Sequence, residues 1–262
     1  MQISKDHPRY KSLVTREMMS SKVREGIVAE TGLIAHGRGE AFDYLLGERT
    51  TDNARRAEMV AAAILLDAER PVISVNGNTA ALCAEGIVEL ADAVRAKIEV
   101  NLFHRSDQRM ERVCRLMTEA GAKDVLGRQA ESRIPGIASD RALCARTGIY
   151  SADVVLVPLE DGDRAEALVK FSKKVIAIDL NPLSRTAEAA HVAIIDEVTR
   201  AIPNMASLVP ELRRDPERRK ALAASFDNRS NLKEAKELMC ENLRHKADRA
   251  KEISEARRCL PD

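Results

Sequence analysis

Residues 175–186 read Val175-Ile176-Ala177-Ile178-Asp179-Leu180-Asn181-Pro182-Leu183-Ser184-Arg185-Thr186. The apolar, mostly β-branched residues at the start of this stretch indicate a short buried strand. Polar and charged residues follow at once, from Asp179 to Arg185. Ligands of an open α/β sheet bind beyond the carboxyl ends of its strands, so we expect a binding site at this loop.

Other segments repeat the arrangement of an apolar strand followed by polar groups. The further strands are expected over residues 71–75, 97–100, 153–158 and 192–195. Helical patterns separate them, over residues 79–95, 106–120 and 163–172. Central parallel strands are buried on both faces and are therefore apolar throughout. The alternation predicts an α/β fold, with a Rossmann-like parallel sheet and helices on both faces.

Helical additions are expected before and after this core. Residues 11–31 read as a helix that Gly32 ends, and residues 52–67 as a second helix. Pro203 and Pro216 are expected to interrupt the region after the sheet. We expect a single composite domain over residues 1–262. Its parts are an N-terminal helical part (1–67), a Rossmann-like core (68–202) and C-terminal helices (203–262).

Two segments have patterns of a different kind. Residues 231–258 form a charged helical pattern, typical of a helix on a subunit surface or against a partner. Its few apolar residues are Leu232, Leu238, Met239, Leu243 and Ile253. Residues 127–152 show no clear periodicity, and a loop of that length usually covers a site or is mobile.

Composition excludes several classes of partner. The chain has 262 residues, with 42 Lys and Arg against 41 Asp and Glu, so no basic field indicates nucleic acid. Aromatic residues make up 3% and Trp is absent, which leaves few platforms for base stacking. The N-terminus lacks an apolar signal region, and no apolar run is long enough to span a membrane. We expect no membrane partner and a cytoplasmic location.

The cysteines are dispersed and form no C-x-x-C pair, which favours reduced thiols over disulfides or a zinc site. They are Cys83, Cys114, Cys144, Cys240 and Cys259. Cys114 lies in the apolar part of a helical pattern, where core packing explains it best.

Arg38 stands between Gly37 and Gly39. The glycines would allow a close backbone approach, and the guanidinium could grip a phosphate or carboxylate by two parallel bonds. A turn between two helices, with Arg38 and Glu40 in solvent, explains the pattern equally well. The dinucleotide fingerprint G-x-G-x-x-G is not formed, because Phe42 stands at its third glycine position and no clear strand precedes it.

Carboxylates and arginines that converge on one sheet edge favour a phosphorylated substrate or a nucleotide. Asp161, Asp163 and Asp179 suit Mg²⁺, which binds through one or two carboxylates and phosphate oxygens. The candidate anion-binding arginines are Arg16, Arg38, Arg49, Arg164 and Arg185.

Structural explanations stand beside these roles. Asp163 could cap its helix, and Asp179 could form an ion pair with Arg185. His36 and His104 are as readily solvated as functional, and His191 fits a structural role before its strand. The common P-loop and Ser/His/Asp motifs are absent.

Several runs, in order within residues 6–202, are similar to those of archaeal phosphopantothenate synthetase, also called 4-phosphopantoate–β-alanine ligase. They are His7-Pro8-Arg9-Tyr10 and residues 32–45, 75–78, 101–103, 157–164 and 178–185. The resemblance implies an enzyme of coenzyme A biosynthesis that joins 4-phosphopantoate to β-alanine using ATP. It also implies a 4-phosphopantoyl adenylate intermediate, AMP and diphosphate as products, a homodimer, and an ATP site without the glycine fingerprint.

The resemblance also implies ATP contacts from the helical N-terminal part and from the strand ends. These residues are Arg16, Arg38, Asp179, Leu180, Asn181, Arg185, Thr186, Glu197 and Val198. The family has an amide where this chain has Glu197, so a backbone contact is expected at that position.

The reaction suggests roles for individual residues. Arg38 and Arg185 would stabilise charge on the α-phosphate and on the leaving diphosphate, together with Mg²⁺. Asp161 and Asp163 would bind Mg²⁺ or the β-alanine ammonium group, and Asp163 is the third catalytic candidate. The strand ends also suggest that the pantoyl hydroxyl and phosphate are held by Asn76, Asn78 and Arg105.

Two other classes of function remain as alternatives. A nicotinamide-dependent oxidoreductase fits the sheet pattern, but it needs a pyrophosphate-binding turn that the sequence lacks. A non-enzymatic nucleotide-binding module would bind ATP without turnover and use the long C-terminal helix for its partner.

Overall fold

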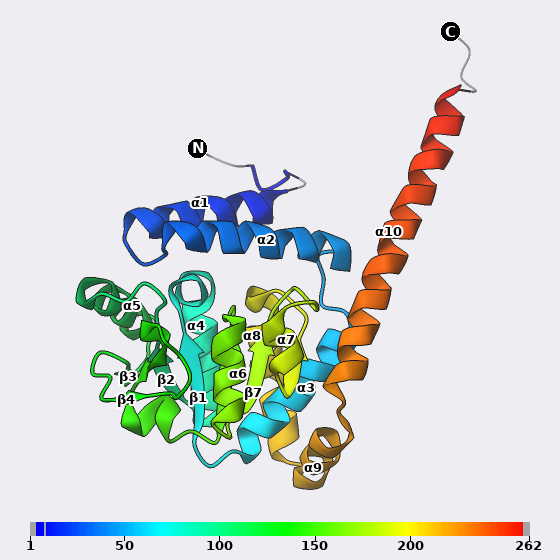
Figure 1. The fold of residues 1–262 in the computed structure, drawn as a ribbon. Helices are drawn as coiled ribbons and strands as arrows, with labels where there is room; N and C mark the ends of the chain where they lie inside the picture. Colours follow the sequence, from blue (N-terminus) through cyan, green and yellow to red (C-terminus); the bar gives the residue numbers. More distant parts are fainter. Residues whose placement is uncertain (1–3, 8, 259–262) are drawn as a thin grey trace.

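The computed structural model describes residues 4–7 and 9–258, with side chains as far as Asp248 (Figure 1). A six-stranded sheet forms its centre, in the order β3-β2-β1-β6-β7-β8. All neighbouring strands are parallel. The strands are β1 (Pro71–Val75), β2 (Lys97–Val100), β3 (Val125–Leu126), β6 (Val154–Pro158), β7 (Lys174–Ile178) and β8 (Val192–Ile194).

The chain winds from β1 to β3 on one side and from β6 to β8 on the other, so the winding reverses between β1 and β6. One face of the sheet carries α3 (Asp52–Asp67), α4 (Gly77–Val94), α5 (Asp107–Glu119) and α8 (Val198–Arg213). The other carries α6 (Gly162–Lys170), α7 (Arg185–Ala189) and the start of α10 (Asn228–Arg258). The expected doubly wound fold is confirmed.

The alternation of side chains along each strand separates the two cores. In β7, Ile176 and Ile178 pack with the first group of helices, whereas Val175 and Ala177 pack with the second. Their complete burial explains why this strand reads as an uninterrupted apolar run.

The helices α1 (Tyr10–Arg24) and α2 (Glu30–Leu46) form a hairpin that lies over one edge of the sheet and is called the roof below (Figure 1). The expected single helix over residues 11–31 is wrong. Gly26, at φ +69°, ends α1, and the N–H of Ile27 returns to the carbonyl of Lys22. Gly32 lies inside α2, where a Cβ would come 2.3 Å from Oδ1 of Asn78. Gly32 therefore provides room for a neighbour and does not end a helix.

Residues 127–152 are packed against the sheet and are not the long irregular loop that their lack of periodicity predicted. They contain the antiparallel pair β4 (Ser132–Arg133) and β5 (Leu143–Cys144), a 3-10 turn (Asp140–Ala142) and a π-helical turn (Arg146–Tyr150). Glu99 of β2 accepts hydrogen bonds from the N–H groups of Ala145 (2.8 Å) and Ile149 (2.6 Å). Burial raises the pKa of Glu99.

The C-terminal helices differ from the expected pattern in two ways. Pro203 lies inside α8 without ending it, whereas Pro216 begins α9 (Pro216–Ser225). The first turns of α10 are core, because Leu232 and Met239 are buried against the sheet; Leu243, further along, is half exposed. Side chains from residue 249 onward, including Ile253, lie outside the description.

The described cysteines are all free, and Cys114 is buried in the core as expected. Cys144 is also buried, Cys83 is partly buried and Cys240 is exposed, while Cys259 lies outside the described residues. Within the described ranges, no helix has the length and apolar content needed to cross a membrane.

Glu58 is a buried carboxylate between α3 and α8. Its side chain is fully inaccessible, and it accepts hydrogen bonds from Asn204 (3.1 Å) and Arg55 (3.3 Å). Burial, with a smaller effect from the charge of Asp196, raises the pKa of Glu58 to about 7.

This pKa predicts a pH-dependent stability. Between its ordinary pKa and about 7, the folded state binds the proton more tightly than the unfolded state does. The free energy of unfolding should therefore fall as pH rises through this window, by on the order of 1 to 3 kcal/mol. Urea unfolding of wild type and Glu58→Gln at pH 5, 6, 7 and 8 measures it. The difference between the two proteins should change with pH; parallel curves would contradict the assignment.

Candidate active site

A cavity of about 910 Å³ lies between the carboxyl ends of the strands and the α1–α2 hairpin. The segments after β1, β2, β6, β7 and β8 all contribute to its lining, through Asn76, Phe103, Asp161, Asn181 and Glu197 among others. It spans the point where the winding reverses, which is where doubly wound sheets bind ligands.

Arg38 lines the cavity from the middle of α2. The expected turn between two helices is wrong, because the segment is helical, while the contact of Arg38 with an anion stays a prediction. A Cβ on Gly37 would meet open space and one on Gly39 would make ordinary contact with Leu180 at 3.5 Å. The side chain of Arg38 forms no hydrogen bond or ion pair with any residue in the described part of the chain. Its guanidinium is therefore available to an anion.

The loop after β7 is fixed by its own hydrogen bonds. Asp179 accepts one from the N–H of Asn181 at 2.9 Å and another from the hydroxyl of Ser184. Burial raises the pKa of Asp179, while these bonds and the charge of Arg38 act in the opposite direction. Leu180 is buried, and Thr186 donates to the carbonyl of Glu160 at 2.8 Å. The loop is thus rigid before any ligand binds.

Arg185 also lines the cavity, at the first position of α7. The alternative of an ion pair with Asp179 is wrong. Arg185 instead lies 3.9 Å from Asp163 and 3.5 Å from Glu166, and its side chain is 65% exposed. Such exposed pairs are weak, so Arg185 can turn towards a ligand at little cost.

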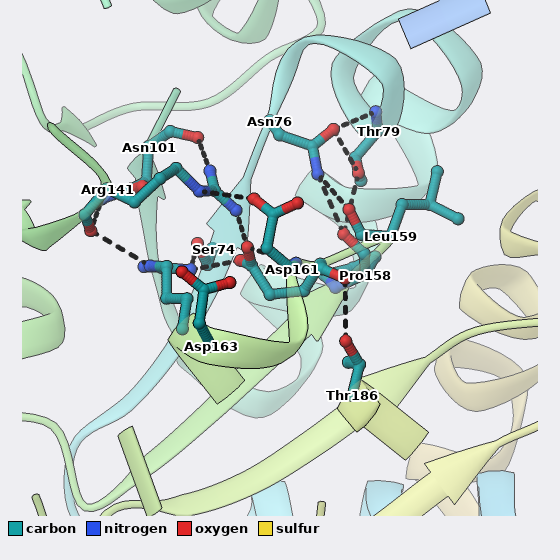
Figure 2. A network of polar contacts seen from close by, with 12 residues as sticks. Ser74, Asn76, Thr79, Asn101, Arg141, Pro158, Leu159, Asp161, Asp163 and Thr186 are labelled. Atoms are coloured by element: carbon teal, nitrogen blue, oxygen red, sulfur yellow. Dashed lines mark hydrogen bonds and ion pairs between the residues drawn. The ribbon is translucent and has the colours of Figure 1, made fainter. Parts of the chain in front are cut away.

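A buried charge cluster lies after β6. The carboxylate of Glu160 is 2% exposed and contacts both Arg141 and Arg164. Arg164 also donates to Ser74 of β1 at 3.2 Å, and Arg141 donates to the carbonyl of Asn101 at 2.5 Å (Figure 2). Arg164 is thus structural, and its expected role as an anion-binding residue is wrong.

Both buried arginines keep their charge near neutral pH. Burial lowers the pKa of Arg141 to about 9 and that of Arg164 to about 10. Asp161 also forms an ion pair with Arg141 at 3.4 Å, so the two arginines are matched by two carboxylates where Arg141 meets the cavity.

Asn76 joins the two halves of the sheet. Its Oδ1 caps α4 by accepting from the N–H of Thr79 at 3.0 Å, and its Nδ2 donates to the carbonyls of Pro158 and Leu159 (Figure 2). Leu159 has φ +53°, a strained value for a branched residue. Asn78, by contrast, holds the roof: its Nδ2 donates to the carbonyl of Gly32 at 2.8 Å.

Several expected site residues lie elsewhere. Arg105 donates to the carbonyls of Gly127 (2.7 Å) and Arg128 (3.2 Å) and does not line the cavity. Arg16 is likewise outside the lining and pairs with Glu40 at 2.8 Å. Asp163 and Arg49 also lie outside it.

The remaining expected residues have identifiable environments. Asp163 is in the first turn of α6 but is not its N-cap, a position that Asp161 occupies. Glu197 caps α8 through the N–H of Thr199 at 2.8 Å, and Val198 beside it is buried. His191 accepts from the N–H of Val175 at 3.1 Å, which confirms its structural role.

Several lining residues were not predicted from the sequence: Lys11, Asp43, Arg109, Arg141 and Arg200. Arg200 is the most heavily bonded of them. It makes paired bonds to Asp43 of α2 (2.5 and 3.0 Å) and bonds Asp196 after β8 (2.6 and 2.8 Å). Asp196 precedes the N-cap of α8, so this contact depends on the turn after β8 and the spacing of four residues does not by itself indicate it.

These features define a doubly wound α/β protein with a candidate ligand site at the reversal of its winding, beneath two added helices. A family model described as phosphopantothenate/pantothenate synthetase matches residues 53–242. The chain belongs to this family, as the resemblance in its sequence indicated.

Curated relatives with one shared name match most of the chain. The 4-phosphopantoate–beta-alanine ligase of Methanospirillum hungatei is 59% identical over 213 residues, which cover 81% of this chain and 87% of the relative. The ligase of that name from Methanosarcina mazei is 50% identical over 243 residues (92% and 96%). The one from Thermococcus kodakarensis is 46% identical over 256 residues (97% and 95%).

The Asp43–Arg200 pair should hold the roof to the sheet. Its side chains are only 12% and 16% exposed, so removing either partner should destabilise the protein by about 2 to 4 kcal/mol. Asp43→Ala, Arg200→Ala and the double variant form a cycle measurable by urea unfolding. The effects should not add. Arg56→Ala, which breaks an exposed pair with Glu234, should cost less than about 1 kcal/mol. Additive effects at Asp43 and Arg200 would rule out the coupling.

Proposed function

We propose that this chain is a ligase that joins 4-phosphopantoate to β-alanine at the expense of ATP and so forms 4'-phosphopantothenate for coenzyme A biosynthesis. The observation that carries the proposal is similarity to ligases of one name over nearly their whole length. The cavity supports it, because its volume of about 910 Å³ suits a nucleotide and a second substrate together.

ATP is assigned to the β7–β8 side of the cavity. Asp179, Asn181 and Val198 line this side. The carboxylate of Glu197 is already used to cap α8, so a backbone contact is the one assigned there. Arg16 would reach the nucleotide only by leaving Glu40.

The proposed reaction has two steps. A carboxylate oxygen of 4-phosphopantoate attacks the α-phosphorus of ATP, and diphosphate leaves. The neutral amine of β-alanine then attacks the acyl carbon, AMP leaves, and the amine loses a proton. Arg38 and Arg185 would stabilise the negative charge that develops on the phosphate oxygens, because a cation attracts that charge more strongly inside a cavity than in open water.

Mg²⁺ is proposed to accompany ATP. Among the described residues, no group of three or more His, Cys, Asp or Glu side chains could hold a metal ion. A cavity without such a group fits Mg²⁺ that is bound mainly by phosphate oxygens and by a single protein carboxylate. Asp161 lines the cavity and is the assigned carboxylate, whereas Asp163 lies outside the lining. When bound, the ion would neutralise phosphate charge.

The product of ATP tests this function directly. The purified protein would be incubated with ATP, Mg²⁺, 4-phosphopantoate and β-alanine, and each acid or amine would be omitted in turn. AMP that forms only with both co-substrates supports the proposal. ADP would replace the adenylate with an acyl phosphate, and no turnover would sink the ligase assignment.

Arg38→Ala should lower kcat by about 10²- to 10³-fold, because it removes an unpaired cation from the cavity. The variant should stay folded, since Arg38 is exposed within a helix and bonds no described residue. Arg24→Ala, at the exposed end of α1 and outside the cavity lining, is the matched control. Unchanged kinetics in Arg38→Ala would remove this residue from the site.

We also propose a homodimer in the cytoplasm. Free thiols at Cys83, Cys114, Cys144 and Cys240 support a reducing compartment. Beyond Leu243, α10 projects from the body of the molecule and offers a surface for a second copy (Figure 1). Sedimentation equilibrium should give twice the chain mass of 28.9 kDa, and a monomer at all concentrations would contradict the dimer.

A further inference from the structure

The end of the cavity beside β1 and β2 contains an arginine whose charge is not neutralised. Arg109, from the first turn of α5, donates to the carbonyls of Ile27 (3.0 Å) and His104 (3.0 Å). No carboxylate of the described chain forms an ion pair with it. The two carbonyls fix the guanidinium in place but leave its positive charge available.

Arg141 adds a buried donor without a partner. Its side chain is 3% exposed, yet its Nε makes no hydrogen bond. Oδ2 of Asp161 lies 3.4 Å from this Nε, in an ion pair without hydrogen-bond geometry (Figure 2). A buried N–H without an acceptor is costly and uncommon, and Arg141 lines the cavity. A ligand oxygen at this point would satisfy it.

The start of α4 meets the same place. The N–H groups of Gly77 and Asn78 have no acceptor among the described residues, because the Asn76 cap serves Thr79. A Cβ on Gly77 would come 2.6 Å from Nη2 of Arg109 and 2.3 Å from the carbonyl of Ile27. Glycine at this position therefore lets the guanidinium lie directly against the helix N-terminus, where the helix dipole also favours an anion.

We propose that Arg109, Arg141 and the first N–H groups of α4 form the subsite for the phosphate group of 4-phosphopantoate. This assignment rests on the proposed function. Arg105, suggested by the sequence for this role, lies outside the cavity, whereas Arg109, one turn further along, lies within it.

Charge and position favour this phosphate over other anions. Arg141 is paired with Glu160 and Asp161, so the charge available to a ligand comes from Arg109 and the helix terminus, which favour a phosphate over β-alanine, whose ammonium group they would repel. ATP is assigned to the opposite, β7–β8 side. A phosphate held beside β1 and β2 would leave the pantoyl carboxylate facing the middle of the cavity, towards the α-phosphate of ATP.

Steady-state kinetics of Arg109→Gln tests the subsite. KM for 4-phosphopantoate should rise roughly 10- to 100-fold, the effect of losing a charge-assisted contact. KM for ATP and for β-alanine should stay within about twofold. Arg115→Gln, an exposed arginine on the same helix paired only with Glu119, is the matched control and should change none of the three. Wild type should also bind inorganic phosphate competitively with 4-phosphopantoate, and Arg109→Gln should weaken that inhibition by a similar factor.

The other outcomes separate the sources of phosphate. A rise in KM for ATP alone would place an ATP phosphate here and overturn the proposal, as would unchanged constants or a rise for β-alanine alone. Arg109→Lys is the second variant if Arg109→Gln does not fold; it keeps the charge but loses the planar fork, and it should still raise KM for 4-phosphopantoate. A wild type that makes no phosphopantothenate refutes the proposed function instead. In that case, thermal stabilisation by inorganic phosphate that Arg109→Gln abolishes would still support the anion subsite.

Discussion

The buried carboxylate of Glu160, held between Arg141 and Arg164, is the interaction on which the site depends. Arg164 belongs to α6 and also bonds Ser74 of β1, while Arg141 belongs to the packed segment beyond β3 and bonds the end of β2. The cluster thus connects α6, on one side of the point where the winding reverses, to β1 and β2 on the other side. Removing one member of such a buried set leaves an uncompensated charge, at a cost of about 3 to 5 kcal/mol. The cavity edge can therefore hold its shape without a ligand.

The same cluster shapes the electrostatics of the cavity. Two arginines share one buried carboxylate, and Asp161 and Glu99 supply the remaining negative charge nearby. The charge of Arg141 is therefore matched by carboxylates, whereas Arg109 at the same edge has no carboxylate partner among the described residues. Asn76 and the strained backbone of Leu159 complete the joint between β1 and β6. Strain of this kind persists only where surrounding contacts enforce it, and here they are the hydrogen bonds of the switch point.

The strands were predictable because burial on both faces leaves only apolar, branched residues, as in residues 175–178. The roof was not. A glycine such as Gly32 often ends a helix, yet here it leaves room for the side chain of Asn78, which lies 46 residues away in sequence. Residues 127–152 lack periodicity because tertiary contacts such as Glu99 to Ala145 hold them, not a repeating local pattern. Arg105 and Arg109 could not be distinguished from spacing, since the carbonyls that orient them come from distant segments.

The arginines near the cavity differ in what already satisfies them, and this difference separates binding groups from structural ones. Arg164 and Arg200 are each paired with a carboxylate, and Arg164 is completely buried, so a ligand gains little from their charge. Arg109 is oriented by carbonyls, which fix its geometry without cancelling its charge. Arg38 bonds no described residue, while Asp179 beside it is held by Ser184 and Asn181. An anion can therefore engage Arg38 without breaking the loop after β7. The sequence identifies arginines near strand ends, but only the fold shows which of them are not paired with a carboxylate of the described chain.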